Sequence, residues 1–256
     1  MKKILSALPL TLMLVGCGAP ATSGGANDAT NNAASSDNAA PAAENVAAEN
    51  TAPATADAGK PTYKVIDEAQ PGMPTALVEG LKKAKVSPPP ASLKVPDKAR
   101  VRLETSKGPV TIELNTKEAP LHARSFYYLA QKGFYNGTSF HRFADLLQGS
   151  GKPGNIIQGG DPLSRDAKTQ NYAGAGGPGY QVPRERNALK HDRLVIAAAR
   201  SQDPDSAGSQ FYITQNPVYF LDQNDGYTVF GKVVEGADNA LNLRKDDTLT
   251  KAEIVK

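Results

Sequence analysis

The chain has 256 residues, of which 39% are hydrophobic and 21% are charged, and its formal net charge at pH 7 is +3. This length fits one sizeable domain with appendages, and the charge lacks the basic excess of nucleic-acid-binding proteins, so nucleic acid is not an expected partner. A single cysteine allows neither an internal disulfide nor a cluster of thiolate metal ligands.

The N-terminus has the pattern of a bacterial lipoprotein signal peptide. Two lysines precede an apolar run at residues 4–15, and small residues precede the only cysteine, Cys17. A charged start followed by a short apolar run is typical of a secretory signal, and this run is too short to span a bilayer. We therefore expect residues 1–16 to be removed and Cys17 to carry the lipid. An ordinary signal peptide with an incidental cysteine is the alternative.

Residues 17–60 are predicted to be a flexible, disordered tether that begins with the lipidated cysteine. From Gly18 to Lys60 there is no aromatic residue, and Val46 is the only aliphatic side chain larger than alanine. Such a composition cannot bury enough apolar surface to offset the loss of chain entropy. Gly18, rather than an aspartate, follows the cysteine, which by the usual bacterial sorting pattern favours the outer membrane. The expected location is thus the periplasmic side of the cell envelope.

Residues 61–97 form a proline-containing segment to which the sequence assigns no role. Leu77, Val78 and Leu81 are spaced so that they could form a short helix or pack on the following domain. Three consecutive prolines at residues 88–90 interrupt any regular element.

From residue 98 to 256 the pattern predicts a β-rich domain. Apolar and polar residues alternate at residues 101–105 and 110–114, on either side of a short turn, which is typical of a β-hairpin. Pro120 begins a stretch with helical spacing that Gly133 ends. Short strands are expected at residues 139–143, 155–158, 195–199, 210–214, 228–234 and 252–255. Many short strands with one or two helices indicate a closed barrel.

Several common catalytic motifs are incomplete in this sequence. The glycine-rich stretches at residues 149–154 and 174–179 lack the spacing of a phosphate-binding loop and the flanking strand and helix of a dinucleotide site. The three histidines lie far apart, which argues against zinc. No Gly-x-Ser-x-Gly elbow is present. We expect no cofactor and no metal.

Five sequence blocks carry a resemblance to a known family. They are FYNGTSFHRF, IIQGGDP, GGPGY, AGSQFYIT and YTVFGKVVEG, in this order between residues 134 and 236. Together they resemble the cyclophilin-type peptidyl-prolyl cis-trans isomerases over roughly residues 100–256. The resemblance implies a mainly β fold, a closed eight-stranded antiparallel barrel capped by two helices. It also implies that the chain is an enzyme that accelerates rotation about X-Pro peptide bonds.

The resemblance also implies a site. Arg142 would be the catalytic arginine and Gln158 would orient it and hold the substrate carbonyl. Substrate contacts would come from the rim, the walls of an apolar proline pocket and the residues facing the peptide backbone: His141, Ile156, Ala199, Gln210, Tyr212, Phe220, Leu221 and Tyr227.

One position departs from the family pattern. Asn155 stands where the family places a pocket phenylalanine, and the loop between Arg142 and Asn155 is also longer than usual. Either this loop supplies Phe143 or Leu146 as a substitute wall, or activity is reduced. The expected function is folding assistance to proline-containing, exported proteins by a monomeric, lipid-anchored isomerase. The alternative is a peptide-binding or chaperone module that has lost catalysis.

Overall fold

The computed structural model describes residues 63–223 and 226–255. The predicted signal peptide, Cys17 and the predicted tether to residue 60 lie outside these residues. Within them, antiparallel strands dominate, and no helix has the length and apolar character needed to cross a membrane.

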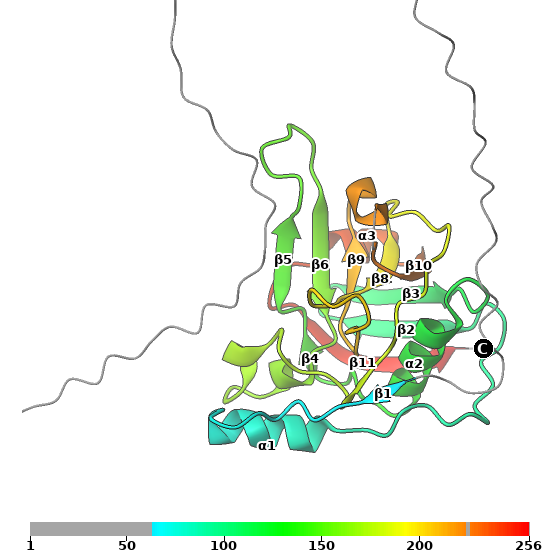
Figure 1. Cartoon of the computed structure of the whole chain (residues 1–256). Coiled ribbons are helices and arrows are strands. Elements are labelled where there is room, and N and C mark those ends of the chain that lie inside the picture. Colours follow the sequence, from blue (N-terminus) through cyan, green and yellow to red (C-terminus); the bar gives the residue numbers. More distant parts are fainter. Residues whose placement is uncertain (1–62, 224–225, 256) are drawn as a thin grey trace, which may run out of the picture. The chain divides into compact units, whose positions relative to one another are not determined.

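Nine strands form one antiparallel sheet in the order β4-β11-β2-β3-β10-β8-β9-β6-β5 (Figure 1). Their bounds are β2 Arg100–Thr105, β3 Gly108–Leu114, β4 Thr138–Ser139, β5 Arg142–Asp145, β6 Asn155–Gly159, β8 Val195–Ala198, β9 Phe211–Thr214, β10 Val229–Glu235 and β11 Thr248–Val255. The expected hairpin is confirmed, because β2 and β3 pair in register from Arg100↔Glu113 to Thr105↔Gly108. Their alternating apolar side chains are fully buried in the main core, at Val101, Leu103, Val110 and Ile112.

The two edge strands of this sheet are joined by only two residues, Phe140 and His141. The sheet must therefore curl until its edges approach each other. Phe140 still bonds to the β11 side, through its N–H to the Asp247 carbonyl at 2.8 Å and its carbonyl to the Asp246 N–H at 2.8 Å. Two residues later, Arg142 pairs with β6. The mainly β, barrel-like fold is thus confirmed, as a curled half-barrel whose edge strands β4 and β5 do not pair with each other. It has nine strands and not the expected eight, because the one strand expected at residues 139–143 divides here.

Helix α2, Pro120–Gln131, also matches the expectation. Pro120 occupies its first turn, and Gly133, with φ +67°, follows its end. The first N–H groups of the helix bond to a residue far along the chain: the Glu185 carboxylate accepts from Leu121 N at 2.8 Å and from His122 N at 2.9 Å. A carboxylate at this position satisfies otherwise unbonded donors and offsets the positive end of the helix dipole.

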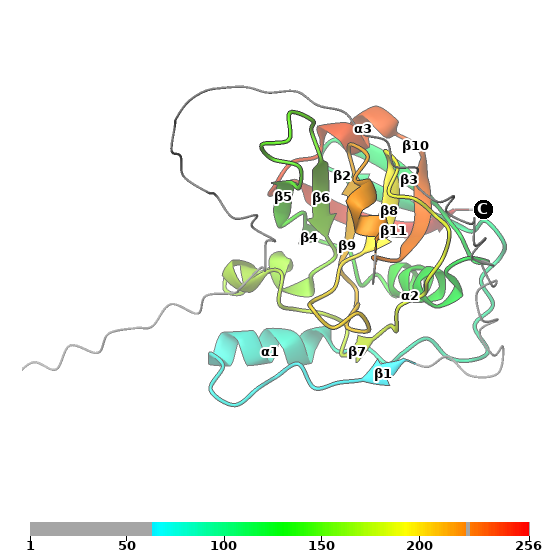
Figure 2. The same ribbon diagram turned by 45° about the horizontal axis from the view of Figure 1, so that its top comes forward.

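The described residues contain two further helices, α3 and α1. Helix α3, Ala237–Asn242, covers one end of the curled sheet and α2 the other (Figures 1 and 2). Helix α1, Thr75–Ala84, lies outside the barrel in the segment to which the sequence assigned no role. Short helical turns η1 Pro162–Arg165, η2 Gln170–Tyr172 and η3 Tyr219–Asp222 lie in the connections.

The segment before the barrel packs on the domain, which is one of the two alternatives from the sequence. Strand β1, Lys64–Val65, pairs with β7, Tyr180–Gln181, in a separate two-stranded sheet. Figure 2 shows α1 running beneath the barrel, beside the connection that carries η1. Leu77 and Leu81 of α1 are buried against Leu163. Both alternatives therefore hold, because the segment forms helix α1 and this helix also packs on the domain.

Candidate functional site

Arg142 and Gln158 lie directly opposite each other on β5 and β6. Facing residues of antiparallel strands project their side chains from the same side of the sheet. The register therefore places the two polar groups together, and Arg142 Nη1 donates a hydrogen bond of 3.1 Å to Gln158 Oε1. Both side chains are half-buried. One N–H group of the Arg142 guanidinium is bonded to Gln158, and its other N–H groups are left to bond a bound molecule.

A chain of hydrogen bonds fixes the orientation of Gln158. Its amide nitrogen donates to Gln210 Oε1 at 3.0 Å. The Gln210 amide nitrogen in turn donates to the Gly176 carbonyl at 2.8 Å and to Asp161 Oδ2 at 3.2 Å. Since each amide has a defined donor and acceptor end, the chain determines which atom Gln158 turns toward Arg142.

Asp161 anchors this chain although the sequence analysis did not single it out. It is fully buried, and its carboxylate accepts hydrogen bonds from Leu163 N at 2.7 Å, Gly174 N at 2.5 Å and Gly176 N at 2.8 Å. A buried carboxylate is tolerated when its oxygens are satisfied in this way. The Gly-Gly-Asp-Pro sequence after Gln158 was quoted only for the resemblance, and the partners of Asp161 lie up to 49 residues away.

An apolar cluster adjoins the polar chain. Ile156 and Tyr212 are 2% and 3% exposed, and both belong to one cluster with Ala197, Val218 and Val229. Three other residues predicted to contact the substrate are half-buried against the same cluster, namely Ala199, Leu221 and Tyr227. The structure thus brings these predicted wall residues together, next to Gln158 through the register pair Gln158↔Tyr212.

Of the two residues that could replace the wall missing at Asn155, only Leu146 contacts the apolar cluster. Of the two candidates from the sequence, Phe143 packs instead on the main core and lies 5.0 Å from the Arg244 guanidinium. Leu146 packs on the Ile156 cluster. The connection between β5 and β6 therefore adds an apolar side chain to this cluster.

Phe220 lies differently from the other predicted wall residues. It is 43% exposed on η3 and is absent from the buried cluster that its neighbour Leu221 joins. Tyr219, also on η3, is 54% exposed. The aromatic face of this turn is consequently available to a bound molecule.

His141 is half-buried beside Arg142, and neither ring nitrogen makes a hydrogen bond of good geometry among the described residues. Burial lowers the pKa of this imidazole, the Arg142 charge lowers it further, and Asp161 opposes both. The neutral form of His141 is therefore favoured, and both of its ring nitrogens are buried.

A buried histidine that the sequence analysis assigned no role supports the apolar cluster. His191 has no exposed surface; its Nε2 lies 2.8 Å from the Tyr212 hydroxyl and its Nδ1 lies 2.6 Å from Asp222 Oδ1. Burial lowers the pKa of His191 although Asp222 raises it. The neutral ring then donates from Nδ1 to Asp222 and accepts from the Tyr212 hydroxyl. This links η3 to β9 across a sequence separation that no local pattern reveals.

Tyr227 forms the far side of the cluster. Its ring lies edge-on to Tyr212, with centroids 6.0 Å apart, and the Arg200 guanidinium lies 4.3 Å from its centroid. A cation over an aromatic face is attracted by the ring quadrupole. The contact holds the ring at the rim of the cluster.

A family model for the cyclophilin type of peptidyl-prolyl cis-trans isomerase matches residues 100–256. That range contains every residue of the site described above. The chain belongs to this family. The curled antiparallel sheet and its flanking helices match the fold of this family.

Relatives agree with this assignment. A peptidyl-prolyl cis-trans isomerase of Arabidopsis thaliana is 35% identical over 157 residues, which are 61% of this chain but only 29% of that protein. Peptidyl-prolyl cis-trans isomerase A of the bacterium Dickeya dadantii is 39% identical over 143 residues, 55% of this chain and 68% of that one. A cyclophilin-type isomerase of Cryptosporidium parvum, solved in the presence of the dipeptide Ala-Pro, is 28% identical with a TM-score of 0.50, covering 61% of this chain and 99% of that one.

In this cyclophilin, backbone N–H groups of the glycine-rich loop at residues 174–179 are already hydrogen-bonded to carboxylates of the chain. Asp161 accepts from Gly174 and Gly176, and Glu68 accepts from Gly177 N at 3.2 Å and Gly179 N at 3.4 Å. These backbone donors are thus occupied rather than offered to a phosphate. Among residues 63–223 and 226–255, no group of three or more His, Cys, Asp or Glu side chains is arranged to hold a metal ion.

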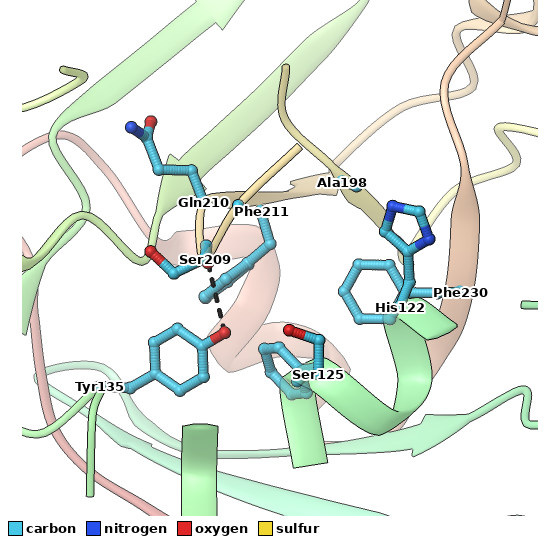
Figure 3. A pocket seen from close by; sticks show the side chains of 10 residues that line it. His122, Ser125, Tyr135, Ala198, Ser209, Gln210, Phe211 and Phe230 are labelled. Carbon is cyan, nitrogen blue, oxygen red and sulfur yellow. Dashed lines mark hydrogen bonds between the residues drawn. The ribbon is translucent and has the colours of Figure 1, made fainter. Parts of the chain in front are cut away.

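A small cavity lies behind Gln210, between α2 and β9 (Figure 3). Its volume of about 10 Å³ has room for about one water molecule and is too small for a proline ring. His122 and Phe230 line one side, and Tyr135, whose hydroxyl donates to the Ser209 carbonyl at 3.2 Å, lines the other. The Gln210 amide points away from this cavity, toward the polar chain. This cavity is therefore not a binding site for a proline ring.

Proposed function

We propose that this cyclophilin accelerates cis–trans rotation about X-Pro bonds with Arg142 as the catalytic residue. The observation that carries the proposal is the pairing of the Arg142 guanidinium with Gln158 beside the apolar cluster around Ile156 and Tyr212. A proline ring needs an apolar wall, and the rotating bond needs a donor. No nucleophile is required, because rotation breaks no covalent bond.

The physical task is to lower a rotation barrier of roughly 18–20 kcal/mol. At the twisted transition state the C–N bond loses its double-bond character and the prolyl nitrogen regains a lone pair. A fixed donor aimed at that nitrogen stabilises the transition state more than either planar ground state. Arg142 suits this role because a guanidinium stays charged at any working pH and presents several donors in a rigid fork.

The other residues bind and orient the peptide in this proposal. Gln158 holds Arg142 and the substrate carbonyl, and Gln210 and Ala199 contact the peptide backbone. Ile156, Tyr212, Leu221 and Leu146 surround the proline ring, while His141, Phe220 and Tyr227 form the rim. Proline-containing segments of unfolded proteins are the proposed substrates.

The deciding experiment is an isomerisation assay with the full-length protein and an X-Pro peptide. Acceleration over the uncatalysed reaction, which takes tens to hundreds of seconds, supports the proposal. Binding of the peptide without acceleration would instead support the second candidate, a peptide-binding or chaperone module. Asn155 is the observation that favours this second candidate, since the pocket lacks the aromatic wall usual in the family.

We further propose that the protein works on exported proteins in the bacterial cell envelope, anchored through Cys17. The support is the charged and apolar N-terminal sequence before Cys17 and the low-complexity stretch behind it. Stable anchoring takes two or more acyl chains, because one holds a protein only marginally. In cells, Cys17→Ser should release the domain from the outer-membrane fraction or leave an unprocessed precursor. Unchanged fractionation and unchanged mature mass would contradict the anchor.

A further inference from the structure

Residues 63–97, which we call the N-terminal segment, lie outside the family match but contact the loop that holds Gln210. This loop, residues 161–181, is called the site loop below. Strand β1 pairs with β7 through Lys64↔Gln181 and Val65↔Tyr180. Two further backbone bonds join the segments, from Ile66 N to the Gly179 carbonyl at 3.0 Å and from Val86 N to the Pro178 carbonyl at 2.9 Å.

Apolar packing reinforces these bonds. Leu77 and Leu81 of α1 cover Leu163, which is 1% exposed. Gly80 permits the close approach, since a Cβ there would lie 2.9 Å from Leu163 Cδ2. The N-terminal segment and the site loop therefore form one packed unit.

Glu68 makes the contact closest to the site. Its half-buried carboxylate accepts from Gly177 N at 3.2 Å and Gly179 N at 3.4 Å. Only glycine fits this approach at residue 177, because a Cβ would lie 2.5 Å from Glu68 Oε1. Gly179, with φ +83°, also has a backbone conformation that favours glycine.

The site loop is thus held from two sides by two carboxylates. Asp161 holds Gly174 and Gly176 from the barrel side, and Glu68 holds Gly177 and Gly179 from the N-terminal segment. The Gly176 carbonyl, which accepts the Gln210 amide at 2.8 Å, belongs to the same peptide unit as the Gly177 N–H that Glu68 holds. Loss of Glu68 would therefore free one side of the peptide unit that carries this carbonyl.

We propose that Glu68 is a positioning residue for peptide binding: it fixes the site loop so that the Gly176 carbonyl keeps Gln210 oriented toward Gln158 and the substrate. The inference rests on the proposed isomerase function. It makes the N-terminal segment part of the working site and not a spacer between the barrel and the residues before it.

The test compares full-length Glu68→Ala, Glu68→Gln and Glu79→Ala with the wild type in the isomerisation assay. Glu79 is an exposed glutamate on α1 with no role in the contact, so it is the matched control. Loss of charge-assisted hydrogen bonds to the loop should raise KM by about tenfold in Glu68→Ala, with kcat within about twofold. Glu68→Gln should be intermediate, because its amide oxygen can accept from one of the two glycines. Glu79→Ala should match the wild type.

Folding and function are separated by two further readouts. Amide hydrogen exchange should accelerate at Gly177 and Gly179 in Glu68→Ala while the β2–β3 amides keep their protection, and the assay temperature should lie below every unfolding midpoint. If Glu68→Ala does not fold, Glu68→Gln carries the comparison. An active wild type with unchanged KM in the folded variants would overturn the positioning role.

An inactive wild type would reject the isomerase proposal but would leave the positioning role of Glu68 to be decided by binding. In that case the dipeptide Ala-Pro serves as the probe in an NMR titration. Weaker binding by Glu68→Ala than by the wild type and Glu79→Ala would support the positioning role, and equal binding would overturn it.

Discussion

At the scale of single residues, Arg142 is placed by two independent constraints. The pairing of β5 with β6 puts it opposite Gln158, and the hydrogen bond to Gln158 selects one orientation of the guanidinium. The glutamine is itself held through Gln210 by buried Asp161. A preorganised donor does not have to reorient as the substrate bond twists, which is what makes such a donor effective.

Arg142→Ala should therefore lower kcat/KM by about 10² to 10³, the scale seen when one transition-state donor is removed. Arg142→Lys should be intermediate because lysine keeps the charge and loses the fork. Initial rates on an X-Pro peptide measure this effect. The control is Arg102→Ala, since Arg102 lies on β2, is half-buried and pairs with Glu104. Near-full activity of a folded Arg142→Ala would show that the donor is another group.

Tyr212→Phe should lower the free energy of unfolding by about 1–3 kcal/mol, because it leaves the buried His191 Nε2 without a partner. The proline pocket keeps its apolar ring, so kcat/KM should change by less than about threefold. Urea denaturation provides the measurement. The control is Tyr219→Phe, which removes an exposed hydroxyl that donates to Asp192 at 2.8 Å and should cost no more than about 0.5 kcal/mol. Equal effects of the two substitutions would argue against the buried network.

At the scale of elements, the hairpin of β5 and β6 has two functions. Its strands place Arg142 and Gln158, and the connection between them, residues 146–154, begins with the side chain that completes the apolar cluster. The loop is positioned by Asp145, the last residue of β5, whose carboxylate accepts from Leu147 N at 3.0 Å and Gly154 N at 2.8 Å. The connection thus adds Leu146 to the apolar cluster while the register of β5 and β6 stays regular.

Leu146→Ala should raise KM for an X-Pro peptide by about fivefold, since about 1 kcal/mol of apolar contact is lost when a leucine wall is truncated. Adding Asn155→Phe to that variant should restore most of the loss by providing the wall from β6. Leu147→Ala, the neighbouring residue outside the cluster, serves as the control and should stay within about twofold. The hypothesis fails if Leu146→Ala and Leu147→Ala have the same KM.

At the scale of the whole molecule, buried ionisable groups make stability depend on pH. Burial lowers the pKa of His141 and His191 below the ordinary value of 6.5. The unfolded chain then binds protons at these sites before the folded chain does, so their stabilising contribution is lost as pH falls through 6.5. Glu68 acts in the opposite direction, because burial raises its pKa and the folded chain binds that proton more tightly.

The free energy of unfolding should therefore fall as pH is lowered from about 7.5 to about 5.5, where the histidines titrate. Urea denaturation at several pH values measures the slope. His141→Gln should flatten the dependence, because it removes one of the two histidines without removing buried packing from the main core. A stability that is constant over this range, or that rises on acidification, would contradict the assignment of neutral histidines.

Local patterns in the sequence were enough to predict the elements whose residues interact with near neighbours. The β2–β3 hairpin follows from alternating residues around a short turn, and α2 follows from Pro120, its apolar spacing and Gly133. The same patterns placed one strand at residues 139–143, which the structure divides at Phe140 and His141. Alternation indicates extended backbone, but it does not say which neighbour each residue pairs with. Only the curling of the sheet decides that Thr138 and Ser139 pair with β11 and that Arg142 pairs with β6.

The sequence by itself determined the family, the order of the strands along the chain and the residues around Arg142, because these depend on residue types at fixed spacing. The tertiary structure alone decided which residues support that site. Asp161, His191 and Glu68 hold their partners at separations of 49, 31 and 109 residues, and the path of one loop brings Leu146 to the apolar cluster. A buried polar group must find a partner in space, and the partner's distance along the chain leaves no periodic trace in the sequence.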